Sequence, residues 1–452
     1  MRALADKNAK KTRPIKRNVY FEKAREIPII ARKDVLVGGG GPAGLSAAIS
    51  AARAGADVLL VERCGYLTGA HASAIIGTFC GIFNLVGGRP NQLIKGLTSE
   101  LLDNLKLHNG LSEPIRDGNA AIVVYDPFLF KQLSEELVLK AGAEILMHAW
   151  IADVIMEGNQ IKGLIIESKA GRQAILGKVV IDATGDGDIA ARAGVPFRLG
   201  EKGFMQFPST MFRMENVNQE KAKHVTFAEL RQQIRAAKET ARFRLPREDG
   251  LFFFTPRKGE VVCNVTTVSR GGKVINGTDP VDLTFAEIEG KRQAREYERF
   301  FREKIPGFEE SFIDDTGEIG IRETRIIDGE YILKNKDVME GRKFEDAIAR
   351  TSWPIERHTL HEVKLVWLEE GDYYEIPFRC LLAQKVENLL VVGRCISAEH
   401  QAQASVRVAG PCFAEGEAAG TAAAKVVKGK MRLRDLDPVE LRKQLQRNGA
   451  NL

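Results

Sequence analysis

The sequence lacks the features that mark several large classes of protein. No apolar run reaches the ~20 residues that a membrane-spanning helix needs, so we expect no membrane span. The six cysteines include no C-x-x-C pair, which argues against an iron–sulfur cluster, a zinc cluster and a disulfide reductase. Scattered cysteines are typical of free thiols in a reducing compartment, and no apolar segment of a signal peptide follows the basic start. We therefore expect a cytoplasmic protein.

Charge is nearly balanced except at the N-terminus. The net charge is only +6, yet residues 1–33 carry eleven Lys or Arg against three acids. We interpret residues 1–30 as a solvated basic arm, since no other nucleic-acid-binding motif accompanies them. A length of 452 residues, 44% of them hydrophobic, is sufficient for two or three domains with buried cores.

The most informative stretch is DVLVGGGGPAGLSAAISAARAGADVLLVE, residues 34–62. Residues 35–37 read as a buried strand, residues 42–54 as a helix, and residues 58–61 as a second strand. A glycine cluster lies between the first strand and the helix. This βαβ pattern with a G-x-G-x-x-G turn predicts a dinucleotide-binding unit.

Each position of this turn holds a residue that suits a dinucleotide-binding unit. Gly39 permits the tight turn, Gly41 permits close approach of a pyrophosphate, and Gly44 permits the helix to pack against the strand. Pro42 suits the first helical turn, and the helix N-terminus offers free N–H groups to the diphosphate. Glu62 ends the second strand, where a carboxylate accepts hydrogen bonds from a ribose.

Residues 68–90 are rich in Gly, Ala and Ser, and we expect an irregular segment that lies flat against a planar ligand. A helix is predicted over 91–107, and a second over 127–141 between Asp126-Pro127 and Gly142. An antiparallel meander is predicted from strands at 143–148, 150–156, 161–167 and 173–181.

A second match to G-x-G-x-x-A occurs at Gly185, Gly187 and Ala190. No strand with a terminal acid follows at the required distance, so we reject a second nucleotide site. Instead, we expect the backbone at 183–185 to pack beside the first glycine turn and to add to the same site.

Composition changes along the chain divide it into five parts. Residues 197–386 are densely charged, with a phenylalanine cluster at 252–254 and a long helix near 283–304, which indicates a separate substrate or cap domain. Buried α/β character returns with an apolar strand at 389–392 and a small-residue helix after Gly410-Pro411. The predicted parts are a basic arm (1–30), a first nucleotide-binding part (31–196), the cap (197–386), a second nucleotide-binding part (387–428) and a peripheral tail (429–452).

Three separated segments together resemble a known family. GGGPAG with Glu62, IDATGDGD, and NLLVVGRCIS…RVAGPCFAEGEAAGTAAA resemble the FAD-dependent oxidoreductases of the glutathione-reductase-like flavoproteins, including fumarate reductase and succinate dehydrogenase flavoproteins. The resemblance implies an α/β fold: a Rossmann-like FAD-binding domain with a discontinuous second half and an inserted α+β substrate or cap domain. It also implies that FAD is held extended, with the isoalloxazine near residues 407–410 and the dipole of the following helix.

The resemblance implies a set of cofactor-binding residues that runs along the whole FAD molecule. They are Gly39, Gly41, Pro42, Ala43, Gly44, Glu62, Arg63, Gly69, His71, Ala72, Ala183, Thr184, Gly185, Asp188, Gly393, Arg394, Val408, Ala409 and Gly410.

His71 carries two open interpretations. Succinate dehydrogenase and its relatives similarly place a histidine near this point that is joined covalently to the flavin, although their flanking sequence differs from GAHAS. The alternative, which we favour, is that His71 packs beside a non-covalent flavin or hydrogen-bonds to it.

Arg407 is the leading candidate for substrate binding, because fumarate reductases similarly place an arginine here to hold a substrate carboxylate. Arg322, in the cap motif IRETRIIDGEY, would act with it. The alternative for Arg407 is an internal salt bridge, for instance to Glu399 or Glu323.

His358 and His361 are three residues apart, but no third ligand accompanies them, so we expect no metal site. They are interpreted as a helix-surface pair or as the source of one proton donor or acceptor in the site. Tyr331 and Tyr374 are weaker candidates for the same role.

The predicted function is that of a dehydrogenase or reductase which transfers a hydride between flavin N5 and a small organic substrate, with carboxylate-bearing substrates as one candidate class. No second βαβ unit is present for a nicotinamide cofactor, so a quinone, a carrier protein, oxygen and transiently docked NAD(P)H all remain open as the electron partner. Two alternative functions are a flavoprotein that modifies transfer RNA and a non-catalytic FAD-binding subunit. A homo-oligomer is compatible with the sequence, and we do not expect a nucleic-acid partner.

Overall fold

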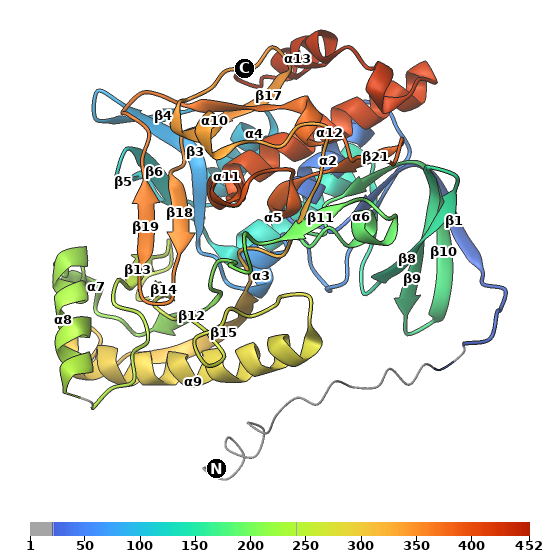
Figure 1. Cartoon of the computed structure of the whole chain (residues 1–452). Helices are drawn as coiled ribbons and strands as arrows, with labels where there is room; N and C mark the ends of the chain where they lie inside the picture. The colour runs from blue at the N-terminus through green and yellow to red at the C-terminus, as the bar shows by residue number, and fades with distance from the viewer. Residues whose placement is uncertain (1–19, 21, 241) are drawn as a thin grey trace.

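A computed structural model describes residues 20, 22–240 and 242–452, and most of the predicted basic arm (1–19 and 21) lies outside the described residues. The centre of the fold is a seven-stranded sheet in the order β7-β2-β1-β10-β9-β8, with β21 paired to β10 (Figure 1). Its strands are β1 (Ile29–Gly38), β2 (Val58–Val61), β7 (Glu144–Leu146), β8 (Trp150–Glu157), β9 (Gln160–Ser168), β10 (Gly171–Asp182) and β21 (Leu389–Val391).

This sheet corrects the predicted meander. Only β8, β9 and the first half of β10 form antiparallel pairs. Strand β10 also pairs in parallel with β1 along most of its length and with β21 at its end. Strand β7 leaves the meander and pairs in parallel with β2. The α/β class is confirmed. Residues 389–391, which are distant in the sequence, complete the sheet, as expected for a FAD-binding domain with a discontinuous second half.

Two helices that are far apart in the sequence pack closely against each other on one face of the sheet. They are α2 (Pro42–Arg53) and α12 (Ala409–Gly429). A Cβ on Gly416 would lie 2.0 Å from the Ala43 carbonyl oxygen, and one on Gly420 would lie 2.2 Å from that of Ala47. The close packing predicted from the Ala and Gly content is therefore confirmed. Helix α5 (Pro127–Ala141) packs beside α2 and has the predicted bounds.

The cap is a four-stranded antiparallel sheet with its own apolar core (Figure 1). Its strands lie in the order β13 (Leu251–Phe254), β14 (Val261–Asn264), β12 (Ser209–Glu215) and β15 (Phe312–Gly320). It also contains α7 (Gln219–Ala222), α8 (Phe227–Glu239) and the long helix α9 (Pro280–Lys304). The buried face of α9 includes Tyr297, Phe300 and Phe301, which join the cap core.

The expectation of an irregular segment over 68–90 was wrong for much of its length. After the short helix α3 (Ala70–Ser73), the chain forms β3 (Thr78–Val86), which pairs with β4 (Arg89–Gln92) and β6 (Ala120–Val124); β5 (Ile115–Asp117) completes that sheet. Gly81 has a φ of 77°, and the register shifts between Phe79 and Phe83, so the strand does not show a regular alternation in sequence. Helix α4 (Leu97–Leu107) starts later than predicted, after Gly96 with a φ of 69°.

Much of the C-terminal part of the predicted cap belongs to the main body. Side chains between Leu333 and Leu382 lie in the same apolar core as α2 and α12. These residues form α10 (Asn335–Met339), β17 (Ala347–Thr351), β20 (Tyr374–Pro377) and the hairpin of β18 (Ile355–His358) and β19 (Val363–Val366). The predicted peripheral tail is also packed: helix α13 (Pro438–Arg447) buries Leu441 and Leu445 in that core.

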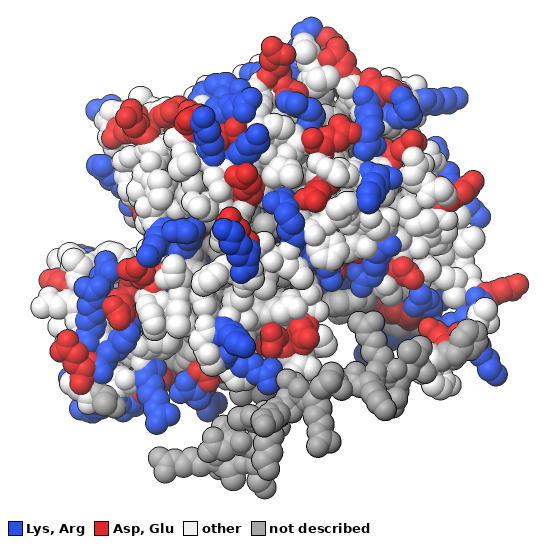
Figure 2. All heavy atoms as spheres, in the orientation of Figure 1, with Lys and Arg blue, Asp and Glu red and all other residues white. Residues whose placement is uncertain are grey.

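The remaining elements are α6 (Asp188–Arg192), β11 (Phe197–Leu199) paired with β16 (Arg325–Ile327), and α11 (His400–Val406). Basic and acidic side chains are interspersed over the face shown in Figure 2. In the part of the chain that the structure describes, no helix combines the length and the apolar character needed to cross a bilayer.

A buried carboxyl between α12 and α4 gives a prediction about stability. Burial raises the pKa of Glu417 to about 7, although its carboxylate accepts a hydrogen bond from the Leu97 N–H (3.2 Å). The pKa of Glu417 in the folded state lies above its value in the unfolded state. Glu417 therefore contributes to the free energy of unfolding fully at low pH, and this contribution is lost as the pH rises from 4.5 through about 7. Glu417→Gln should therefore raise the free energy of unfolding at pH 8 by up to about 3 kcal/mol and have little effect at pH 4.5.

Urea unfolding followed across this pH range measures the effect. Glu100→Gln is the matched control, because Glu100 sits nearby on α4 and its pKa is lowered by a salt bridge to Arg53. Removing that carboxylate should not stabilise the protein at pH 8. Equal stability of wild type and Glu417→Gln at both pH values would contradict the prediction.

Candidate functional site

The glycine turn after β1 is built by close backbone contacts. Gly39 has a φ of 96°, and a Cβ there would lie 2.4 Å from the Ala183 carbonyl oxygen. A Cβ on Gly44 would lie 1.8 Å from the Gly39 carbonyl oxygen. The Ala183 N–H donates to the Gly38 carbonyl (2.9 Å), so the IDATGDGD segment lies beside the first glycine turn, as the sequence predicted.

Gly41 differs from these glycines because no protein atom crowds it. It is the N-cap of α2 with a φ of −69°, and a Cβ there would meet nothing closer than the Gly69 Cα at 3.9 Å. Pro42 occupies the first helical turn, and Gly41 provides no side-chain cap. The free N–H groups of α2 therefore face space that a diphosphate requires.

Glu62 is buried and rigidly held beside this turn. Its two carboxylate oxygens accept hydrogen bonds from the Gly40 N–H (2.7 Å) and the Cys64 N–H (2.8 Å). A small cavity, open to solvent, lies next to it and is lined by Gly39, Val61, Glu62, Arg63, Ala149, Trp150, Ile151, Thr184, Asp186 and Asp188. The Arg63 guanidinium lies over the Trp150 ring, 5.4 Å from its centroid. The carboxylates, the hydroxyl and the aromatic ring of this lining are groups that can contact a nucleoside.

The IDATGDGD loop is tied to the cap motif by ion pairs. The Asp186 carboxylate accepts from Arg394 Nη2 (2.8 Å) and from the Thr324 hydroxyl (2.8 Å). The Asp188 carboxylate accepts from Arg325 Nη1 (2.9 Å). Because Arg394 follows β21 and Arg325 begins β16, these contacts join the IDATGDGD segment both to the NLLVVGRCIS segment and to the cap motif.

His71 does not reach toward the glycine turn. Its ring is buried among Phe79, Tyr125 and Phe130, with centroids 5.4, 5.6 and 5.9 Å away. Its Nδ1 lies 2.8 Å from the Tyr125 hydroxyl, and burial lowers the pKa of His71 to about 4. The adjacent Ala72, by contrast, is only partly buried in the same short helix.

The start of α12 is packed onto β3. A Cβ on Gly410 would lie 2.5 Å from the Gly81 carbonyl oxygen, and one on Gly81 would lie 2.7 Å from a Val408 methyl. Val408 is the N-cap, and Ala409 is the first helical residue. At the end of β21, the Gly393 N–H donates to the buried Glu415 carboxylate (2.7 Å). The two predicted cofactor segments near 393 and 408 are therefore positioned by the same helix.

Arg407 lies between α11 and α12 and is largely buried. Its Nη2 is 3.6 Å from Glu356 Oε2 and donates to Gln206 Oε1 (3.4 Å). The expected partners Glu399 and Glu323 are wrong: Glu399 accepts from the Asn335 N–H. Arg407 does take part in an internal ion pair, but its partner comes from hairpin β18–β19.

Arg322 is the least compensated charge of this region. Its Nη1 donates to the Phe207 carbonyl oxygen (2.9 Å) and to the Ser209 hydroxyl (2.9 Å). Among the described residues, no carboxylate lies within salt-bridge distance of it. Burial and the neighbouring charges of Arg407 and Arg247 lower the pKa of Arg322 well below its ordinary value. An anion bound here would remove this imbalance.

His358 is paired with a carboxylate on its own strand. Its Nε2 lies 2.9 Å from Glu356 Oε1, and the other oxygen of Glu356 accepts from the Trp353 indole N–H (3.1 Å). Burial would raise the pKa of Glu356, but His358, Arg407 and Arg322 hold it well below its usual range. Burial and the Arg322 charge lower the pKa of His358 below its ordinary value, whereas the contact with Glu356 raises it.

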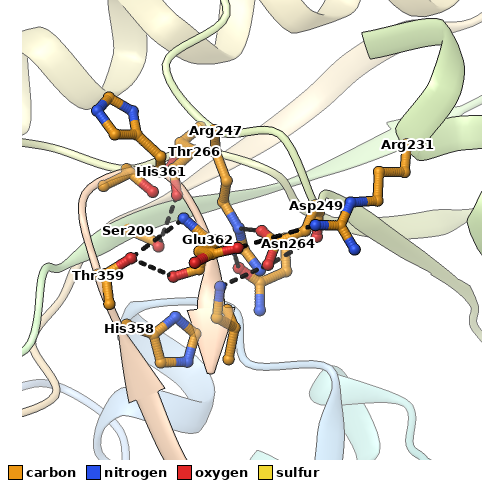
Figure 3. Close-up of polar contacts among 12 residues, drawn as sticks. Ser209, Arg231, Arg247, Asp249, Asn264, Thr266, His358, Thr359, His361 and Glu362 are labelled. Atoms are coloured by element: carbon orange, nitrogen blue, oxygen red, sulfur yellow. Dashed lines mark hydrogen bonds and ion pairs between the residues drawn. The ribbon is translucent and has the colours of Figure 1, made fainter. Parts of the chain in front are cut away.

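The two predicted histidines are not brought together. His358 ends β18, and His361 lies in the turn of the hairpin, so the interpretation as a helix-surface pair was wrong. Figure 3 shows the two rings pointing in opposite directions. His361 is exposed, and its Nδ1 lies 3.3 Å from the Pro246 carbonyl oxygen. Tyr374 is buried against Ser405, and Tyr331 contacts Asp337; both serve packing and structural hydrogen bonds.

Sequence reasoning missed a polar network beside the arginines. Gln206 Nε2 donates to Gln403 Oε1 (2.9 Å), and Gln403 Nε2 donates to the Arg322 carbonyl oxygen (3.0 Å). The Gln206 N–H donates to the buried Glu323 carboxylate, whose other oxygen lies 2.8 Å from His400 Nδ1. His400 and Gln403 lie on helix α11 and Arg407 is its C-cap, and the helical spacing of the three was the only signal in the sequence.

Comparison with known proteins decides the family. The family model described as FAD dependent oxidoreductase matches residues 34–445. The chain belongs to this family of FAD-dependent oxidoreductases. It is therefore an enzyme, and the predicted family and Rossmann-like fold are confirmed.

Individual relatives of this FAD-dependent oxidoreductase match over shorter stretches. Thiamine thiazole synthase of Aeropyrum pernix is 30% identical over 187 residues, which cover 39% of this chain and 61% of that protein. The probable electron transfer flavoprotein-quinone oxidoreductase of Escherichia coli is 31% identical over 174 residues, 35% of this chain and 38% of that protein. The match thus spans less than two thirds of each relative.

Among solved structures, a geranylgeranyl bacteriochlorophyll reductase-like protein from Thermoplasma acidophilum has 15% identity to this oxidoreductase. It covers 92% of this chain and 83% of its own, with a TM-score of 0.49.

Proposed function

We propose that this FAD-dependent oxidoreductase transfers a hydride between flavin N5 and a small organic substrate whose carboxylate is bound by Arg322. The observation that carries the proposal is the buried Arg322 guanidinium, which has no carboxylate partner among the described residues. A guanidinium fork matches a carboxylate in charge and in geometry. Arg407 contributes a second cation to the same region, although Glu356 partly neutralises it.

The residues around the glycine turn fit FAD. The open space at Gly41 would receive the diphosphate, and the cavity beside Glu62 and Arg63 would hold the adenosine. Glu62 uses one lone pair of each oxygen for backbone N–H groups, so each oxygen retains a lone pair for the ribose. When bound, FAD supplies the two-electron acceptor or donor of the reaction.

His358 is proposed as the group that accepts or returns the proton. Because the Glu356 carboxylate can only accept, the His358 Nε2 carries the hydrogen, and Nδ1 is left as an acceptor. Among the described residues, no group hydrogen-bonds to Nδ1. When bound, FAD would take the hydride from the substrate carbon in the oxidative direction, and Nδ1 would accept the proton that the adjacent O–H, N–H or C–H group loses; the reductive direction would reverse both transfers.

An anaerobic screen tests the proposal. The oxidised enzyme is mixed with hydroxy acids, amino acids or saturated acids, and the reduced enzyme with unsaturated acids. Each acid is compared with its methyl ester while the flavin absorbance is followed. We expect an acid to change the oxidation state of the flavin at least 100-fold faster than its ester. If an ester and its acid react equally, the carboxylate role of Arg322 is wrong.

The buried position of His71 supports non-covalent FAD, and this gives a second prediction. The ring packs in an aromatic cluster and is hydrogen-bonded to Tyr125, so a bond to the flavin would require it to leave that core. Acid precipitation of the holoenzyme should release all the FAD into the supernatant. The intact mass of the denatured chain should equal that of the polypeptide alone. A gain of one flavin mass that disappears in His71→Phe would contradict the prediction.

A further inference from the structure

A buried ion pair of the cap contacts the hairpin that carries His358. Arg247 Nε donates to Asp249 Oδ1 (2.6 Å), and the two side chains are only 2% and 7% exposed. Arg247 Nη1 also donates to Asn264 Oδ1 (2.8 Å) in strand β14 (Figure 3). The position of the Asp249 carboxylate is therefore fixed by the cap sheet.

The second oxygen of Asp249 reaches across to the hairpin. It accepts a hydrogen bond from the Val363 N–H, and Val363 is the residue paired with His358 in the β18–β19 register. The neighbouring Glu248 N–H donates to the His361 carbonyl oxygen (3.0 Å) in the hairpin turn. Residues 248 and 249 thus hold the hairpin at two points.

His358 itself is held from the other side. Its carbonyl oxygen accepts from the Phe207 N–H (3.1 Å), and the Phe207 carbonyl oxygen accepts from Arg322. A two-stranded hairpin alone is at most marginally stable, so its position depends on such contacts. Burying two charged side chains costs desolvation free energy, so such a pair adds little stability. Its role here is to select one position of the hairpin.

We propose that Asp249, held by Arg247, is a positioning residue for His358: it fixes hairpin β18–β19 so that the imidazole stays in contact with Glu356. This proposal rests on the proton-transfer role proposed above for His358. It concerns the ring orientation, which can be measured without a substrate.

The test uses ¹⁵N-histidine-labelled holoenzyme. Ring ¹⁵N shifts report which nitrogen carries the hydrogen, and His358→Gln assigns the resonance. Wild type should show the Nε2–H tautomer alone. In Asp249→Asn, the amide offers one acceptor oxygen to two donors, Arg247 and Val363. We expect a mixture of tautomers and at least tenfold faster hydrogen exchange in residues 355–366, with FAD content unchanged.

Asp346→Asn is the matched control, since Asp346 is a similarly buried carboxylate (9% exposed) paired with Arg379 away from the hairpin. It should leave both readouts at their wild-type values. If Asp249→Asn does not fold, Arg247→Met/Asp249→Leu removes the pair without leaving a buried charge and should give the same loss. A single wild-type tautomer and wild-type exchange in the folded Asp249 variant would overturn the proposal. Failure of the proposed function is distinct: His358→Gln would then leave flavin reduction unchanged.

Discussion

Arg322→Met is expected to lower kcat/KM for the carboxylate-bearing substrate roughly 100- to 1000-fold, which corresponds to about 3–4 kcal/mol of lost transition-state stabilisation. Arg322 is buried and has no carboxylate partner among the described residues, so its charge is available to a bound anion. Methionine has a similar length and removes the charge and the fork. The measurement is anaerobic flavin reduction or reoxidation with the acid identified by the screen.

The control for Arg322→Met uses the substrate as well as the protein. The methyl ester of the same acid lacks the charge, so its rate should change less than tenfold, and the preference for acid over ester should collapse. Ser209→Ala removes one hydrogen bond to the guanidinium without removing the charge and should cost less than tenfold. Arg322→Lys should be intermediate, since the ammonium keeps the charge and loses the planar fork. Equal losses for acid and ester would mean that Arg322 has only a structural role.

The glycine turn was predictable because its chemistry is local. The positive φ of Gly39 and the contact of Gly44 with the Gly39 carbonyl oxygen lie within one βαβ unit, and both are present as predicted. Helix α5 was equally predictable, because Asp126 caps its N-terminus and Gly142 ends it with a left-handed conformation. Such signals act over a few residues and need no tertiary information.

The surroundings of the arginines could not be predicted in the same way. Arg407 and Glu356 meet only because α11 packs against hairpin β18–β19, and nothing in the sequence encodes that contact locally. The position of His71 depended likewise on Tyr125 and Phe130, which are more than fifty residues away. The irregular strand β3 was missed because a glycine with positive φ interrupts its alternation.

Gly41→Ala gives the second large effect: FAD affinity should fall roughly 100-fold, about 3 kcal/mol, while the apoprotein keeps its stability. The backbone of Gly41 has a φ of −69°, which alanine adopts freely, and the nearest protein atom to a new Cβ is 3.9 Å away. The methyl group therefore disturbs no protein contact. It occupies the space in front of the α2 N-terminus where the diphosphate would approach the backbone.

Gly44→Ala separates this effect from simple destabilisation. There the new Cβ would lie 1.8 Å from the Gly39 carbonyl oxygen, so helix α2 must move and the apoprotein itself should unfold at lower temperature. Thermal unfolding of the two apoproteins and fluorescence titration with FAD distinguish the cases. The expected pattern is normal Tm with weak FAD binding for Gly41→Ala, and lowered Tm with weak binding for Gly44→Ala. Wild-type FAD affinity in Gly41→Ala would place the diphosphate away from this turn. No protein contact excludes a side chain at Gly41, so only a ligand that lies against the backbone there would require glycine.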